Sequence, residues 1–112
     1  MKATEKETNP LLIDLEETYR EALETSRRKN NDYGGSDGNP YANFFNSTIV
    51  GVSVEKGILV RMMDKVSRIS TLLEKEAQVK DEAIEDTLQD LINYTGILKS
   101  YLKRKDDYGK NV

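Results

Sequence analysis

Apolar side chains recur every three or four positions in three long stretches of the chain, a pattern that predicts amphipathic helices. The first stretch begins with Asn9 as a cap and Pro10 at the first helical position, and it ends near Lys29. The second is capped by Ser53 and runs to about Glu76. One face of the first stretch collects Leu11, Leu15, Thr18, Tyr19, Ala22 and Ser26.

The second predicted helix carries cations beside its apolar face. At 100° per residue, Arg61, Lys65 and Arg68 fall together on the flank of that face, and Asp64 lies one step further round. Gly57 near the start of the helix leaves room for another backbone or a ligand to come close. The predicted apolar face consists of Ile58, Met62, Val66, Ile69 and Leu73.

The third predicted helix follows a short link, residues 77–80, with Asp81 as its cap, so it forms an antiparallel hairpin with the second. Its core face consists of Ile84, Leu88, Leu91, Thr95, Leu98 and Leu102. The opposite side carries Ala83, Asp86, Asp90, Asn93, Tyr94, Ile97 and Tyr101. Two faces therefore need partners, which indicates either a central position in a bundle or a contact in a homo-oligomer.

Residues 30–53 form a long segment that is rich in turn formers yet contains four aromatic side chains, Tyr33, Tyr41, Phe44 and Phe45. A loop of this length in a compact domain is usually functional or disordered, and the aromatic residues favour function. We expect one short helical turn from Pro40 to Asn46. Packing of the loop onto the bundle is an equally good explanation for Phe44 and Phe45.

The overall prediction is an all-α bundle of three main helices plus this short turn. Residues 1–8 are expected to be a flexible lead, residues 9–104 a single domain, and residues 105–112 a charged tail. The chain of 112 residues has a net charge of −3 and contains neither His nor Cys. These absences exclude His-based catalysis, disulfides and Cys/His zinc sites, which leaves carboxylates as ligands for a hard cation such as Mg²⁺.

The acidic balance argues against binding of a nucleic acid backbone, which normally needs a basic surface. No apolar run is long enough to span a membrane, and no signal segment is evident, so a cytoplasmic protein is expected.

Three groups of residues are candidates for chemistry. Arg61, Lys65 and Arg68, with Asp64, fit an anionic ligand, although ion pairing with neighbouring helices would explain them too. Asp86 and Asp90 stand one helical turn apart and repel each other unless Mg²⁺, Arg61 or Arg68 lies between them. The loop supplies stacking rings and polar readers for a base. Its candidates are Lys29, Asp32, Tyr33, Asn39, Tyr41, Asn43 and Phe44.

Three motifs in this order resemble the first of the nucleotide modification associated domain families, which occur largely in phages and bacteria. They are Lys-Asn-x-Asp-Tyr-Gly from Lys29, Gly-Ile-Leu-Val-Arg-Met-x-Asp-Lys-x-Ser-Arg-Ile from Gly57, and Asp-Glu-x-Ile-x-Asp-Thr-Leu-x-Asp-Leu-Ile-Asn-Tyr from Asp81. A more distant likeness is to MazG-type all-α nucleotide pyrophosphohydrolases, which use paired acidic helices and Mg²⁺. Asp86 and Asp90 match the later acidic element, whereas the earlier one has only the spacing of Glu21 and Glu24.

The resemblance and the residues together give three functional hypotheses. The first is a phage-type protein, homo-oligomeric in the host cytoplasm, that binds a nucleotide or nucleotide-derived molecule between the second and third helices. Such a protein would handle a modified nucleotide or sequester an immune signalling nucleotide, as an anti-defence protein does. The second is a Mg²⁺-dependent pyrophosphohydrolase of the MazG type. The third is a helical protein-interaction module.

Overall fold

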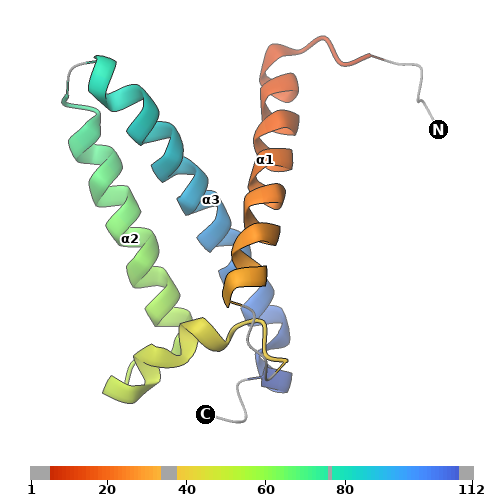
Figure 1. The fold of residues 1–112 in the computed structure, drawn as a ribbon, viewed down its shortest axis with the longest axis vertical. Helices are drawn as coiled ribbons and strands as arrows, with labels where there is room; N and C mark the ends of the chain where they lie inside the picture. The colour runs from red at the N-terminus through yellow and green to blue at the C-terminus, as the bar shows by residue number, and fades with distance from the viewer. Residues whose placement is uncertain (1–5, 34–37, 76, 109–112) are drawn as a thin grey trace.

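The computed structural model describes residues 6–33, 38–75 and 77–108, with the side chains of residues 31–33 and 77–82 left out of the description. Its elements are α1 (Pro10–Tyr33), the 3₁₀ helix η1 (Ala42–Val50), α2 (Val54–Leu72) and α3 (Ala77–Tyr108) (Figure 1). These ranges contain no strand, so the predicted all-α class is confirmed. None of the described helices combines the length and hydropathy that crossing a bilayer requires.

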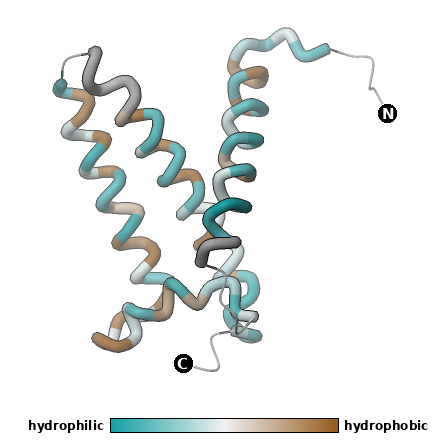
Figure 2. Tube along the Cα trace, in the orientation of Figure 1, coloured by the Kyte–Doolittle hydropathy of each residue, from teal (hydrophilic) through white to brown (hydrophobic). Residues whose placement is uncertain are grey.

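Helix α3 occupies the centre of the fold. It pairs with α2 as an antiparallel hairpin and contacts α1 on its other side, and α1 leans away from the hairpin toward its own N-terminal end (Figure 1). Polar and apolar positions alternate along α1 and α2 (Figure 2). The central position of α3 accounts for its two faces, so no oligomer contact is required to explain them.

The ends of the helices follow local capping only in part. Ser53 caps α2 as predicted, and its hydroxyl accepts a hydrogen bond from the Lys56 backbone N–H at 3.2 Å. The predicted cap at Asp81 is wrong, because α3 already begins at Ala77. Residues 77–80 contain neither Gly nor Pro, and nothing in them opposes an earlier start.

In place of the short turn predicted from Pro40 to Asn46, the structure has the longer helix η1, which ends at Val50 and is capped by Gly51. Gly51 adopts a φ of 79°, a left-handed conformation that favours glycine. Gly57 allows η1 to approach α2 closely, since a Cβ there would lie 2.6 Å from the Ser47 hydroxyl oxygen. The expected close approach at Gly57 is therefore made by another part of the chain.

The core gathers where η1, α2 and α3 meet. Its buried side chains are Tyr41, Phe44, Val54, Ile58 and Tyr101. In α2 the predicted face is only partly correct, because Val66 and Leu73 are 42% and 59% exposed while Leu72 is buried. In α3, Leu88 and Leu102 are likewise exposed and Tyr101 is buried. The packed faces are rotated relative to the predicted ones because η1 and α3 press on the side of α2 that carries Val54, Ile58 and Leu72.

An ion pair joins the start of α2 to the end of α3, with Lys105 Nζ 3.2 Å from Glu55 Oε2. A hydrogen bond from its own backbone N–H is the main cause that lowers the pKa of the Glu55 carboxyl, and Lys105 adds to this while burial opposes it. Burial, and to a lesser degree the charge of Glu55, raise the pKa of the Tyr101 hydroxyl.

Replacing Glu55 with glutamine is expected to remove a pH-dependent part of the stability. A lowered folded-state pKa stabilises the protein above the ordinary value of 4.5, and this stability is lost as the pH falls through the folded-state pKa. The stability difference between wild type and Glu55→Gln should therefore shrink on acidification, as measured by urea unfolding across pH. Glu74→Gln, at an exposed position, is the control; a difference independent of pH would contradict the assignment.

Candidate functional site

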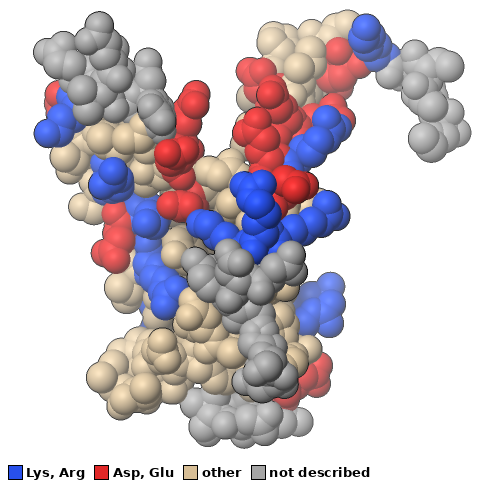
Figure 3. All heavy atoms as spheres, in the orientation of Figure 1, with Lys and Arg blue, Asp and Glu red and all other residues tan. Residues whose placement is uncertain are grey.

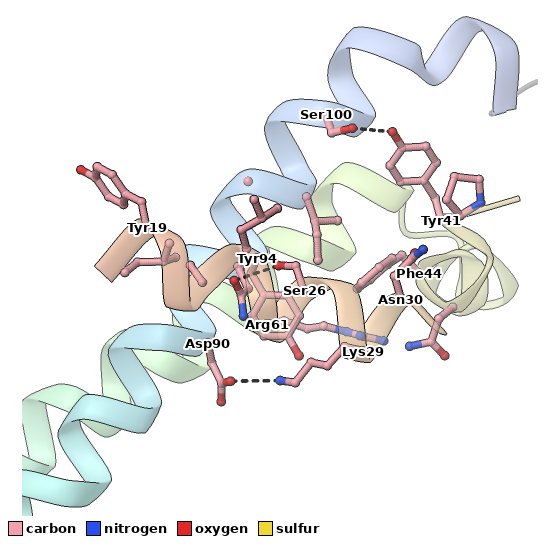
Figure 4. Close-up of a pocket in the computed structure, with 18 residues that line it drawn as sticks. Tyr19, Ser26, Lys29, Asn30, Tyr41, Phe44, Arg61, Asp90, Tyr94 and Ser100 are labelled. Atoms are coloured by element: carbon pink, nitrogen blue, oxygen red, sulfur yellow. Dashed lines mark hydrogen bonds and ion pairs between the residues drawn. The ribbon is translucent and has the colours of Figure 1, made fainter. Parts of the chain in front are cut away.

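A cavity of about 580 Å³ opens between α1, η1 and α3, and α2 contributes Arg61 to its wall (Figure 4). The sequence predicts a cleft between the second and third helices, but this cavity lies mainly between α1 and α3. Its lining consists of Tyr19, Ala22, Leu23, Ser26, Lys29, Asn30, Pro40, Tyr41, Asn43, Phe44, Arg61, Asp90, Ile92, Asn93, Tyr94, Gly96, Ile97 and Ser100.

One side of the cavity is aromatic. The Phe44 and Tyr94 rings meet edge to face with centroids 6.4 Å apart, and the Arg61 guanidinium lies 4.9 Å from the Phe44 ring centroid. A cation over a ring face is attracted by the ring quadrupole, so Phe44 helps to hold Arg61 in place. The Tyr41 hydroxyl is hydrogen-bonded to Ser100. Phe44 and Tyr41 thus pack in the core and line the cavity at the same time.

The other side is charged and centres on Asp90. Lys29 Nζ of α1 lies 3.1 Å from Asp90 Oδ1, and Lys65 Nζ of α2 lies 3.7 Å from Asp90 Oδ2. A cation from the neighbouring helix does meet the carboxylate, as predicted, but Lys65 supplies it in place of Arg61 or Arg68. Of the charged side chains, Lys29, Arg61 and Asp90 line the cavity, so two cations stand against one carboxylate on its wall. The wall of the cavity therefore carries a net positive charge, which favours an anion.

Asn93 carries a hydrogen-bond donor that no described residue satisfies. The Ser26 hydroxyl donates to Asn93 Oδ1 at 3.0 Å, and Asn93 is only 8% exposed. Its Nδ2 is buried and has no partner among the described residues. Such a group costs about 1–3 kcal/mol. The unsatisfied donor therefore lies beside the cavity, in the same side chain whose bond to Ser26 joins α3 to α1.

The structure brings together several of the predicted site residues and leaves others apart. Lys29, Tyr41, Asn43, Phe44 and Arg61 line the cavity, and so does Asp90, predicted as a metal ligand. Asn39 and Lys65 do not line it. Asn39 Oδ1 accepts a hydrogen bond from the Tyr41 backbone N–H at 2.8 Å, and Lys65 Nζ lies 3.7 Å from Asp90 Oδ2.

Arg68 and Asp64 of the predicted helix edge do not line the cavity either. Arg68 is exposed, and its Nε donates to Thr87 Oγ1 at 3.3 Å, a contact between α2 and α3. Asp64 is exposed on α2. The side chains of Asp32 and Tyr33 lie outside the described residues, so their predicted roles stay predictions.

A second, polar cleft of about 540 Å³ lies between α1 and α3 and contains Asp86. Acidic side chains gather on both walls of the gap beside α1, with basic ones toward its base (Figure 3). The described side chains include no group of three or more carboxylates that could hold one metal ion. A Mg²⁺ ion at Asp86 and Asp90 stays a prediction. The cleft is lined by Arg20, Glu21, Glu24, Thr25, Arg28, Glu85, Asp86 and Gln89.

Sequence reasoning did not assign Ser26, Asn30, Asn93 or Tyr94 to the site. The sequence pattern predicts only that Ser26 and Tyr94 lie on helix faces, which gives no indication of a cavity. The only signal was a small polar residue, Ser26, on the apolar side of α1, facing the polar Asn93 of α3. Recognising this pair requires knowledge of how α1 docks on α3.

Comparison with known families gives one match, and it covers most of this site. The family model described as nucleotide modification associated domain 1 matches residues 29–98. That range includes η1, α2, most of α3 and the cavity residues from Lys29 to Ile97. No curated protein and no solved structure matches the chain significantly. Since the match spans more than half of the sequence, the chain belongs to the nucleotide modification associated domain 1 family.

Proposed function

We propose that the protein binds a nucleotide or a nucleotide-derived small molecule in the cavity between α1, η1 and α3. One observation carries the proposal: a single cavity is lined both by aromatic rings and by two cations, Lys29 and Arg61. Its volume of about 580 Å³ falls within the range of roughly 300–1,000 Å³ typical of small-molecule sites.

The parts of a nucleotide match the two sides of the cavity. A base is flat and apolar on its faces, so it packs against the rings of Phe44, Tyr94 and Tyr41. A phosphate group is anionic, and Arg61 offers it a planar fork of donors while Lys29 offers a compact charge. Asp90 positions Lys29, and Asn43 supplies polar contacts to the base or sugar. Arg68 and Asp64 have no ligand contact in this arrangement.

The family name supports a modified nucleotide as the ligand. A signalling nucleotide of host immunity presents the same base and phosphate groups, and a phage protein that retains it without cleaving it would act as a sequestering, anti-defence protein. Both uses need a binder in the compartment where nucleotides occur, in keeping with the predicted cytoplasmic location.

A second candidate function is Mg²⁺-dependent nucleotide hydrolysis of the MazG type. The observation that favours it is the polar cleft, where Glu21 and Glu24 of α1 face Glu85 and Asp86 of α3. Mg²⁺ prefers oxygen ligands and keeps several waters, so one or two of these carboxylates, together with the phosphates of a nucleotide, would be enough to hold it. A third candidate is a helical interaction module, which would use neither the cavity nor the polar cleft.

Incubation with a panel of nucleotides, with and without Mg²⁺, followed by chromatography and mass spectrometry separates the candidates. The proposed binder retains a nucleotide unchanged under both conditions. A hydrolase gives products only with Mg²⁺, and Glu24→Gln should abolish them. A protein that neither retains nor converts any nucleotide but captures a protein partner would overturn the proposal in favour of the interaction module.

A further inference from the structure

Helix α1 carries an uncovered apolar stripe formed by Leu12, Tyr19 and Leu23. Spacings of seven and four residues place these side chains on one side of the helix, and they are 45%, 57% and 51% exposed. The only buried side chain of α1 is Ala22 among those the structure describes, and the hydrophobic core contains no α1 residue. The docking of α1 on α3 therefore leaves its largest apolar side chains in water.

The stripe reaches the wall of the proposed ligand cavity. Tyr19 and Leu23 both line the cavity although each is more than half exposed. In Figure 4 the Tyr19 ring points away from Phe44, Tyr94 and Arg61. The α1 side of the cavity is therefore open at the stripe, and an apolar surface laid on the stripe would close it.

The charges of α1 indicate what that surface is. The C-terminal part of α1 is basic, with Arg27, Arg28 and Lys29, but Arg28 lines the polar cleft and Lys29 pairs with Asp90. Glu16 and Arg27 are the exposed charges that flank the stripe at 100° per residue. Two antiparallel copies of α1 would set Glu16 of each against Arg27 of the other, which is attractive. The exposed apolar side chains of α2, such as Met63, lie on a helix whose charges are mainly basic, so two copies of α2 would repel.

We propose that the α1 stripe pairs antiparallel with the α1 stripe of a second copy about a two-fold axis, and that this contact closes the cavity in both copies. A register with Tyr19 opposite the partner's Leu23 brings Glu16 within reach of the partner's Arg27. Glu16 is available for this contact, since its present bond to Arg20, at 2.8 Å, joins two exposed side chains of the same helix. Closure of the cavity rests on the proposed function; the dimer contact does not.

The test measures the mass of the protein in solution by light scattering and sedimentation, with circular dichroism as the check on folding. Wild type should be a dimer, and Leu12→Arg should be a folded monomer because it places a cation against the basic end of the partner's α1. Met63→Arg, on a similarly exposed apolar residue of α2, should remain a dimer. A monomeric wild type, or a dimer broken by Met63→Arg and not by Leu12→Arg, overturns the proposal.

A charge exchange identifies the partner helix. Glu16→Arg and Arg27→Glu should each weaken the dimer by at least about tenfold, because each sets like charges against each other, and the double variant should restore it. Failure of the double variant to recover contradicts the antiparallel pairing. Closure of the cavity is tested by nucleotide binding. Leu12→Arg should lower the affinity for a nucleotide although Leu12 lies outside the cavity. If the monomeric variant binds a nucleotide as tightly as wild type, the dimer contact does not close the cavity. If wild type binds no nucleotide at all, the proposed function fails, but the molecular masses measured in solution still test whether the protein forms the dimer.

Discussion

Replacing Ile58 with alanine is expected to lower the free energy of unfolding by about 2–5 kcal/mol, the range for removing a large aliphatic side chain from a tight core. Ile58 has no exposed surface and packs among Tyr41, Phe44, Val54 and Tyr101. It is the contact through which α2 supports both η1 and the end of α3. The core of this protein is small, so the loss is a large fraction of a typical total stability.

Leu59→Ala is the matched control, because Leu59 is the next residue in the same helix and is 47% exposed. Its effect should stay near about 0.5 kcal/mol. Chemical denaturation followed by circular dichroism measures both. Equal decreases in the free energy of unfolding for the two variants would contradict the packing of η1 on α2 described above.

Loss of Arg61 or Lys29 is expected to weaken nucleotide binding by about 10- to 100-fold each, since a hydrogen bond to a charged group contributes about 1.5–3 kcal/mol. The effect should depend on phosphate. Arg61→Ala and Lys29→Ala should reduce the affinity for a nucleotide strongly and that for the corresponding nucleoside little, because the nucleoside has no anionic group for them to hold. Isothermal titration calorimetry with such a pair of ligands measures the difference.

Arg104→Ala and Lys103→Ala are the matched controls, since both side chains are exposed on α3 and neither lines the cavity. They should bind as wild type does. A thermal melt of each variant is required, because Lys29 also holds Asp90 and its loss removes one tie between α1 and α3. Equal losses for nucleotide and nucleoside would contradict the placing of phosphate at this end of the cavity.

Local signals account for the part of this structure that the sequence predicts well. The cap at Ser53, the close approach at Gly57 and the helical class each depend on residues near one another in the chain. The start of α3 was misplaced because Asp81 is a good cap in isolation, whereas the helix continues back to Ala77 through residues that do not oppose it.

The candidate site was only half predictable, because its two sides come from distant parts of the sequence. The cations and aromatic rings were recognisable as residue types, and Lys29, Tyr41, Phe44 and Arg61 do meet in one cavity. Their arrangement depends on how α1 docks. Lys29 reaches Asp90 across 61 positions of sequence, and no periodicity could show that this pair, and not Arg68, forms the charged side.

The most direct test of the central claim is a mass spectrum of the small molecules released by denaturing the protein after exposure to a cell extract. Wild type should release a phosphorylated nucleotide, and the Lys29→Ala/Arg61→Ala double variant, purified in parallel and shown to be folded, should release little or none. Equal amounts of nucleotide from the two proteins, or none from wild type, would contradict the assignment of this cavity as a nucleotide site.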